Sequence, residues 1–312
     1  MVSIQQTLNA TPVLRMPASR RKRVNWQRVV AWTVLMLLIL VTLFPFYWML
    51  RIALSDNRAL SANASSLLPA DLTFGAFKRV LGVSSLEEAA AQGGSGAKIS
   101  FWRYLANSVL TSTLITVCQV FFSAMAAYAF ARLRWAGREK VFFLFLTALM
   151  VPPVFTALPN FVTVKELGLL NTYAGIVLPS LLMTPFAVFF LRQFFLGISR
   201  EVEEAAILDG AGHVRIFLRV ILPMSAAPIA TLSLLVYIGA WNEYFWPLLV
   251  GQDESVRVLT VALGIFRSQT PQSGPDWAGL MAATLLAALP VIGLFLVFGR
   301  RIVNSIQFSG LK

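Results

Sequence analysis

The chain has 312 residues, of which 57% are hydrophobic and 13% are charged, and its mean hydropathy is +0.72. A soluble domain carries about a quarter charged residues, so this composition excludes a soluble globular protein and predicts an all-α integral membrane protein. The net charge of +12 is attributed to membrane topology rather than to a nucleic-acid partner. The one cysteine, Cys118, excludes an intramolecular disulfide framework.

Six apolar stretches lie between charged residues, and each meets the need for roughly 20 apolar residues to cross a membrane. Residues 1–24 are polar and Arg-rich and are predicted to form a cytoplasmic tail, and residues 25–312 are predicted to form one transmembrane domain. The first stretch is too long for a cleaved signal peptide and is predicted to be a signal anchor. The predicted spans are about 29–50, 104–131, 141–164, 170–191, 226–250 and 278–299.

The Lys and Arg residues indicate which side of the membrane each loop occupies. Seventeen of the 26 lie on the side that holds both termini and the loops at residues 132–140 and 192–219. The loops on the other side, of which residues 51–103 are the longest, carry nine. Since cytoplasmic loops are enriched in Lys and Arg, both termini are predicted to be cytoplasmic. The basic run at residues 20–23 is expected to meet anionic lipid headgroups.

The long outer loop and the second and third spans follow. Residues 84–100 are rich in Gly, Ala and Ser and are predicted to be an insertion at a loop tip. In the second span, Ser123, Ala127 and Ala131 put small side chains on one face, which permits close approach of a helix from this chain or from another subunit. Three prolines within residues 152–159 predict that the third span is kinked or broken.

A polar stretch with helical periodicity follows the fourth span. Ser199 is a predicted N-cap, and glutamates within residues 201–204 put negative charge where the helix dipole favours it. Gly210 predicts a turn, and apolar residues at i, i+3, i+4 and i+7 from Val214 predict a second amphipathic helix. Pro223 ends that helix or tilts it into the fifth span. Periodicity alone fits equally an interfacial helix pair that covers the loop and a docking element for a partner protein.

The spacing of this stretch resembles the EAA loop of importer-type ABC permeases. The family pattern is Glu-Ala-Ala, three residues, Gly, nine residues and Ile-x-Leu-Pro. Here it occurs as Glu204-Ala205-Ala206, Gly210, Val220 and Leu222-Pro223, with valine in the isoleucine position. A similar Glu-Ala-Ala with a glycine begins at Glu88, but it lies in an outer loop and lacks the Leu-Pro. The stretches 170–175 and 241–248 resemble the carbohydrate-uptake branch of the family, close to the smaller membrane subunit of maltose transporters.

The resemblance implies a permease that forms half of a translocation path in a bacterial or archaeal cell (inner) membrane. Implied partners are a second, related permease, two cytoplasmic ATPase subunits that bind ATP and Mg²⁺, and an extracytoplasmic sugar-binding protein. It also implies that the chain is not an enzyme, has no catalytic or metal-binding residues and binds no cofactor of its own. The loop between spans four and five becomes a cytoplasmic coupling helix seated in a cleft of the ATPase. Its expected ATPase-coupling residues are Glu203, Glu204, Ala205, Ala206, Asp209, Gly210, Leu222 and Pro223.

Aromatic and polar side chains gather near the outer half of the fifth span. An ionisable residue inside a span costs roughly 2.5–3.5 kcal/mol on insertion scales and usually faces a cavity or a partner, so Glu243 needs an explanation. Aromatic rings with hydrogen-bonding neighbours suit a sugar. Alternatively, the aromatic residues anchor the span at the interface and Glu243 pairs with the partner permease. The candidate substrate path consists of Tyr237, Trp241, Asn242, Glu243 and Tyr244.

The expected cargo is a di- or oligosaccharide such as maltose or trehalose, and glycerol phosphate or another polyol is the alternative within the same family. A secondary transporter needs inverted repeats or several intramembrane acids and bases, and Glu243 alone is found. A membrane enzyme lacks paired carboxylates or metal-ligand spacing, and the only histidine is His213 in the EAA loop. Residues 304–312 are shorter than the usual tail of the family, which weakens the expectation of a tail contact with the ATPase.

Overall fold

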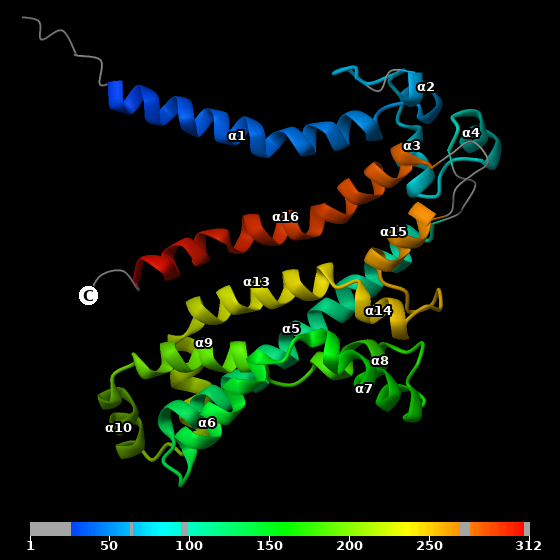
Figure 1. Ribbon diagram of the computed structural model, residues 1–312. Coiled ribbons are helices and arrows are strands. Elements are labelled where there is room, and N and C mark those ends of the chain that lie inside the picture. The colour runs from blue at the N-terminus through cyan, green and yellow to red at the C-terminus, as the bar shows by residue number, and fades with distance from the viewer. Residues whose placement is uncertain (1–25, 63–64, 95–98, 269–274, 309–312) are drawn as a thin grey trace, which may run out of the picture. The chain divides into compact units, whose positions relative to one another are not determined.

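The computed structural model describes residues 26–62, 65–94, 99–268 and 275–308, and all regular structure in these ranges is helical (Figure 1). The chain divides after Tyr47 into two parts, which are described separately. The elements are α1 (Trp26–Ala53), α2 (Asn57–Ala62), α3 (Gly75–Val80), α4 (Leu86–Ala91), α5 (Phe101–Arg132), α6 (Arg138–Thr147), η1 (Ala148–Met150), α7 (Pro153–Glu166), α8 (Tyr173–Val177), η2 (Leu178–Ser180), α9 (Pro185–Leu196), α10 (Arg200–Leu208), α11 (His213–Ile216), η3 (Phe217–Ile221), α12 (Leu222–Met224), α13 (Ala226–Asn242), α14 (Phe245–Val250), α15 (Leu259–Ser268) and α16 (Trp277–Phe308).

The described portion of the first part consists of residues 26–47 of α1. This segment is apolar apart from a few hydroxyl groups and the polar pair Gln27-Arg28 at its start. The hydroxyls of Thr33 and Thr42 donate to the backbone carbonyls of Val29 and Leu38, at 3.0 and 2.8 Å. A hydroxyl bonded within its own helix leaves no polar group unsatisfied, which is what a lipid environment requires.

Three helical stretches are long and apolar enough to cross a membrane, namely α1, α5 and residues Trp277–Val297 of α16. Three further spans are possible if each bent helix pair counts as one. The bends are 97° between Arg138–Met150 and Pro153–Glu166, 49° between Tyr173–Ser180 and Pro185–Leu196, and 81° between His213–Met224 and Ala226–Asn242. The described residues therefore contain between three and six candidate spans, and the all-helical class is confirmed.

Prolines account for two of these breaks. The predicted break in the third span is confirmed, because α7 begins at Pro153 directly after the extended residue Pro152. The break before α9 was not expected from hydropathy. There Thr184 caps the new helix by accepting from the Ala187 amide at 3.4 Å, and Pro185 occupies the first helical turn, where its missing N–H has no cost.

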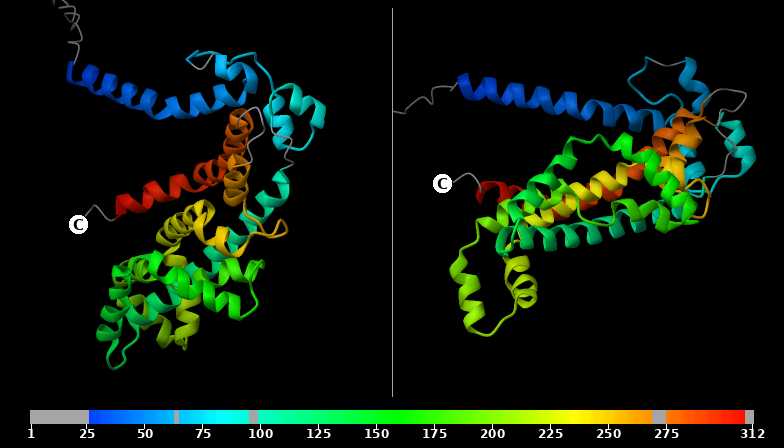
Figure 2. Two further views of the ribbon diagram at one scale, coloured as in Figure 1. Left: turned by 45° about the vertical axis from the view of Figure 1, so that its right-hand side comes forward. Right: turned by 60° about the horizontal axis from the view of Figure 1, so that its bottom comes forward.

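The second part is organised around α5, which packs along α9 and α13, while α13 also packs along α16 (Figures 1 and 2). The small-residue face of α5 lies in this core: Ser123, Ala127 and Ala131 are buried, and the Ser123 hydroxyl accepts from the Thr184 amide at 3.4 Å. The fully buried Leu191 of α9 belongs to the same cluster. The face therefore serves packing within the chain, which favours the first of its two interpretations.

The loop between α1 and α5 is fastened to the start of α16. The Arg79 guanidinium donates to both carboxylate oxygens of Asp276, at 3.1 and 3.0 Å, and to the Gln92 side chain at 2.9 Å. The two charged side chains are 7% and 1% exposed. Asn57 adds a second link by accepting from the Ala278 amide at 3.2 Å. The predicted insertion is largely ordered as α4 with a capping box, although residues 95–98 lie outside the described residues.

Candidate functional site

The stretch that resembles the EAA loop begins with α10. Ser199 is its N-cap, as predicted, and its hydroxyl accepts from the Glu201 amide at 3.3 Å. Glu201 and Glu203 lie in the first turn, where the positive end of the helix dipole stabilises a carboxylate. The polar sequence and this cap explain why α10 starts here instead of continuing α9.

The glycine of the motif ends α10 in a Schellman turn. Gly210 has a φ of +79°, a region that costs other residues roughly 1–2 kcal/mol. Its amide donates to the Ile207 carbonyl, and the Ala211 amide donates to the Ala206 carbonyl, both at 2.9 Å. Ala206 and Ala211 also pack against the core around α5 and α9. The second alanine and the glycine of the motif therefore fix where α10 ends and how it leans on the core.

Glu203 faces the interior of the chain. Its Oε1 lies 3.0 Å from the Arg132 Nε, and the two side chains are 15% and 5% exposed. The two groups meet at ion-pair distance without hydrogen-bond geometry. Arg132 also donates to the carbonyls of Phe195, in the last turn of α9, and of Ile198, just after that helix. One arginine at the end of α5 therefore joins the end of α9 to α10.

The remaining surface of α10 is exposed. Leu208 and Ile207 are 89% and 53% exposed, beside the exposed Glu204 and Asp209. Large aliphatic side chains exposed on a polar helix are the kind of surface that another protein covers. Of the residues expected to couple to an ATPase, Glu204, Ala205 and Asp209 are exposed in the free chain, whereas Glu203 and Ala206 are partly buried.

The second helix of the loop runs from His213 to Met224 and includes a π-helical turn, η3. Leu222 is partly buried against the core, whereas Pro223 is exposed in the last short helix. The chain turns by 81° after Met224 to begin α13. The predicted tilt near Pro223 is therefore present, but it follows the proline by two residues.

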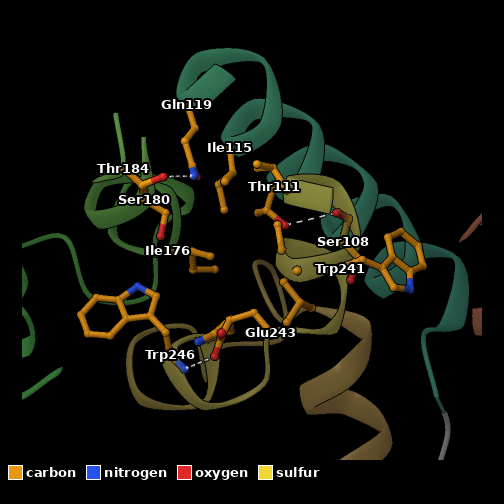
Figure 3. A pocket seen from close by; sticks show the side chains of 15 residues that line it. Ser108, Thr111, Ile115, Gln119, Ile176, Ser180, Thr184, Trp241, Glu243 and Trp246 are labelled. Atoms are coloured by element: carbon orange, nitrogen blue, oxygen red, sulfur yellow. Dashed lines mark hydrogen bonds between the residues drawn. The ribbon is translucent and has the colours of Figure 1, made fainter. Parts of the chain in front are cut away.

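A cavity of about 330 Å³ lies between α5, the η2–α9 segment and the α13–α14 segment (Figure 3). Gln119, Ser180 and Thr184 face it from one side and Glu243 from the other (Figure 3). The Gln119 amide donates to the Thr184 hydroxyl at 3.1 Å. Polar residues of α5 were not predicted as site residues, although Ser108, Thr111 and Gln119 stand out as polar side chains in an apolar span.

Glu243 lies between α13 and α14, not inside a helix, and its backbone is extended. Its Oε1 accepts from the Trp246 amide at 3.1 Å, and its backbone carbonyl accepts from the Thr260 hydroxyl at 2.8 Å. A carboxylate that accepts from the first amides of a helix is stabilised there. The acid within the predicted fifth span thus has a partner in the chain itself.

The five candidate path residues do not converge on one site. Trp241 and Glu243 line the cavity, but the Trp241 indole turns away from its centre and stacks on Tyr237 with ring centroids 5.9 Å apart (Figure 3). Both rings pack in the core beside α16. The Asn242 amide donates to the Ile238 carbonyl, and the Tyr244 ring lies against α15.

The two stretches that resemble the carbohydrate-uptake branch meet in the structure. The Asn171 amide donates to the Val250 carbonyl at 2.7 Å, and the Trp246 indole donates to the Gly175 carbonyl at 3.1 Å. The Asn171 side chain also accepts from the Asp253 amide at 3.0 Å. In the loop after α14, hydrogen bonds from Ser255 lower the pKa of the Asp253 carboxyl below its ordinary value. Of the residues in these contacts, Trp246 also lines the cavity.

Comparison with known proteins identifies the family. The model of the family described as "binding-protein-dependent transport system inner membrane component" matches residues 95–307. The chain belongs to this family. Its members are membrane permeases of ABC importers, whose ATPase is a separate subunit, so the chain is a transport subunit and not an enzyme. Among the described residues, no group of three or more His, Cys, Asp or Glu side chains is arranged to hold a metal ion.

Relatives cover nearly the whole chain. The permease protein of the trehalose/maltose transport system of Thermococcus litoralis is 29% identical over 88% of this chain and 94% of that protein. The permease protein of the sn-glycerol-3-phosphate transport system of Shigella flexneri is 31% identical over 91% of this chain and 97% of that protein. A crystal structure of a bacterial ABC transporter that imports the acidic polysaccharide alginate matches with a TM-score of 0.74, at 25% identity over 88% of this chain and 96% of that chain.

Proposed function

We propose that the chain forms half of the translocation path of an ATP-driven sugar importer. Each bent helix pair acts as one span, so the chain crosses the membrane six times with both termini in the cytoplasm. It pairs with a second, related permease, and two ATPase subunits bind ATP and Mg²⁺ beneath the pair. An extracytoplasmic binding protein delivers the sugar.

The observation that carries this proposal is that α10 is anchored on its inner side and exposed on its outer side. Arg132 and Glu203 hold it to the ends of α5 and α9, while Glu204 and Leu208 remain free to meet an ATPase subunit. A displacement of α10 would therefore move two of the central helices. Coupling also requires that the ATPase bind one conformation of the permease more tightly than the other. Rocking of the spans would then open the path to alternate sides.

A charge reversal on the exposed side of α10 tests this role. We expect Glu204→Lys to release the ATPase or to uncouple hydrolysis from uptake. Glu201→Lys is the matched control, because it makes the same charge change on an exposed residue outside the motif. The measurements are the amount of ATPase that co-purifies with the tagged permease and sugar uptake into vesicles. Normal ATPase association and uptake in both variants would remove the docking role of α10.

The cargo proposed is a neutral di- or oligosaccharide such as maltose or trehalose. Hydroxyl, amide and indole groups line the cavity, and none of its lining residues is Lys or Arg. Sugars present hydroxyl groups that such side chains can bond, whereas a phosphate is usually recognised by cations. Glycerol phosphate or another polyol is the alternative, since a relative with that cargo covers nearly all of this chain.

Uptake by the complete importer distinguishes these cargoes. Labelled maltose, trehalose and sn-glycerol 3-phosphate would be offered to cells that express the chain with its partner subunits. We expect uptake of a neutral sugar and a several-fold loss in Gln119→Leu, which removes an amide from the cavity. Cys118→Ser, one residue away and outside the cavity lining, is the control. Uptake of glycerol phosphate alone would contradict the sugar cargo.

A further inference from the structure

A second cavity, of about 450 Å³, lies where the end of α5, the start of α6 and the start of α10 come together. It is distinct from the cavity beside Glu243 and shares none of its lining residues. The charged residues that line it are five cations and one acid: Arg132, Arg134, Arg138, Lys140, Arg200 and Glu139. The cavity is therefore strongly electropositive.

The acid is already fully engaged within the chain. Glu139 accepts from Arg138 at 3.0 and 2.8 Å and from Arg192 at 3.1 Å, so two guanidinium groups share one carboxylate. Hydrogen bonds from Arg138 are the largest cause of a lowered Glu139 pKa, so this carboxylate stays charged at neutral pH. It has no capacity left to neutralise the remaining cations.

Three cations of the cavity have no hydrogen-bonding or ion-pairing partner among the described residues: Arg134, Lys140 and Arg200. Like charges in one cavity repel each other unless an anion lies between them. Arginine and lysine together suit a phosphate group, which accepts several charge-assisted hydrogen bonds at once. The cavity thus has the charge and the donors to bind a phosphate, and no acid among the described residues neutralises these three cations.

The position of the cavity indicates where such a phosphate comes from. It lies at the ends of α5 and α6, on the side that the Lys and Arg distribution assigns to the cytoplasm. Trp135, which is 40% exposed, lines it, and tryptophan is enriched at the level of lipid headgroups. Basic pockets between transmembrane helices on the cytoplasmic side are known to hold anionic headgroups.

We propose that this cavity binds the phosphate of an anionic phospholipid headgroup. The site adjoins the anchor of α10, because Arg132 carries the ion pair to Glu203 and Arg200 is the first residue of α10. A bound headgroup would hold these two arginines together and so stiffen the attachment of α10 to α5. The inference relies on the proposed cytoplasmic position of this loop, but it does not require that the ATPase bind α10.

The test uses the complete importer reconstituted in phosphatidylcholine nanodiscs with and without phosphatidylglycerol. Native mass spectrometry counts the phosphatidylglycerol that stays bound after release from the disc. The variant combines Arg134→Gln, Lys140→Gln and Arg200→Gln. Its matched control, Arg28→Gln with Arg215→Gln and Arg219→Gln, removes the same charge from the same predicted side of the membrane. We expect retained phosphatidylglycerol to fall by roughly fivefold for each cation removed from the cavity and to stay unchanged in the control.

Three outcomes would overturn the proposal. An equal loss of lipid in both variants would mean that diffuse surface charge holds the lipid. If inorganic phosphate binds to the importer in pure phosphatidylcholine and displaces phosphatidylglycerol, the site serves a soluble phosphate. If the cavity variant loses the ATPase but keeps its lipid, an acidic segment of that subunit fills the cavity. The conservative pair Arg134→Lys and Arg200→Lys should keep the lipid, which separates lost charge from misfolding.

Lipid retention also separates this proposal from the proposed transport function. If phosphatidylglycerol binds in the cavity but Glu204→Lys leaves ATPase association intact, the lipid site stands and the docking role of α10 fails. If instead the importer is coupled to its ATPase but retains no phosphatidylglycerol, the lipid site fails and the transport proposal stands.

Discussion

Gly210, the glycine of the EAA pattern, has the backbone conformation that ends α10. Its φ of +79° lets the amides of residues 210 and 211 turn back onto the last carbonyls of α10. The space where a Cβ would stand is open, so the constraint comes from the backbone and not from crowding. Gly212, two residues later, has a φ of −77° and equally open surroundings. A comparison of the same substitution at Gly210 and Gly212 therefore separates the effect of backbone conformation from that of side-chain volume.

We predict that Gly210→Ala destabilises the end of α10 by about 1–2 kcal/mol, because alanine must adopt a left-handed conformation. Gly212→Ala should be nearly neutral. Hydrogen–deuterium exchange of residues 205–211 in the purified permease measures the fraying, and co-purification measures the effect on the ATPase. Equal exchange in both alanine variants would show that the turn does not depend on glycine.

Glu203 and Glu204 are neighbours in α10 with opposite surroundings. We predict that Glu203→Ala lowers the stability of the isolated permease by about 1–3 kcal/mol, because it leaves the buried Arg132 without its acid. Glu204→Ala should leave that stability unchanged, since the residue is exposed. Thermal unfolding of the permease in detergent, without its ATPase, is the measurement. Matching melting temperatures for the two variants would argue against the anchoring role of Glu203.

At the scale of elements, the link from α3 to α16 is the strongest candidate for a stabilising contact outside the core around α5. The side chains of Arg79 and Asp276 are both buried, so removing either charge takes away the ion pair that the other makes across this link. We predict that Asp276→Asn costs about 3–5 kcal/mol, whereas Arg79→Met combined with Asp276→Leu costs less than that single change. A double-mutant cycle by thermal unfolding tests this. If the double variant is the least stable, the two charges do not act as a pair.

Individual elements were predictable from the sequence where the signal is local. Ser199, the turn at Gly210 and the broken third span all follow from residue types at fixed positions, and the structure confirms them. The break before α9 lies inside an apolar run, so hydropathy does not reveal it, although Thr184-Pro185 is a helix-start signal.

The look-alike motif at Glu88 shows the limit of spacing arguments. It also forms a short helix with a Schellman turn, in which the Gly94 amide donates to the Ala89 carbonyl at 2.9 Å. Here the left-handed residue is Gly93, one position earlier than the motif spacing implies. The local structure of the two segments is therefore similar. The Leu-Pro segment and the position between spans, not the Glu-Ala-Ala helix, distinguish the loop at Glu204.

Contacts between distant segments could not be predicted from the sequence. Nothing in the stretch 170–175 indicates that Asn171 bonds the last residue of α14, or that Trp246 bonds Gly175. The same holds for the cavity, where Gln119 of α5 meets Thr184 of α9. The sequence places all the candidate path residues in one predicted span. In the structure, Trp241 packs into the core, whereas Glu243 follows the end of α13 and lines the cavity.

At the scale of the whole molecule, the charge distribution and the bent helices support the proposed topology of six spans with both termini in the cytoplasm. Cysteine labelling tests it after Cys118→Ser removes the native thiol. Leu208→Cys in α10 and Val83→Cys in the outer loop are suitable sites, because the two side chains are 89% and 75% exposed. We predict that a membrane-impermeant maleimide added to intact spheroplasts labels Val83→Cys and not Leu208→Cys.

Opening the membranes should expose Leu208→Cys to the same reagent, because the cytoplasmic side then becomes accessible. In the proposed topology three spans separate the two positions, namely α5 and the bent pairs at residues 138–166 and 173–196, each of which crosses once. An odd number of crossings requires opposite sides. Labelling of both sites from outside would mean that one bent pair is re-entrant, and α10 could not then meet a cytoplasmic ATPase.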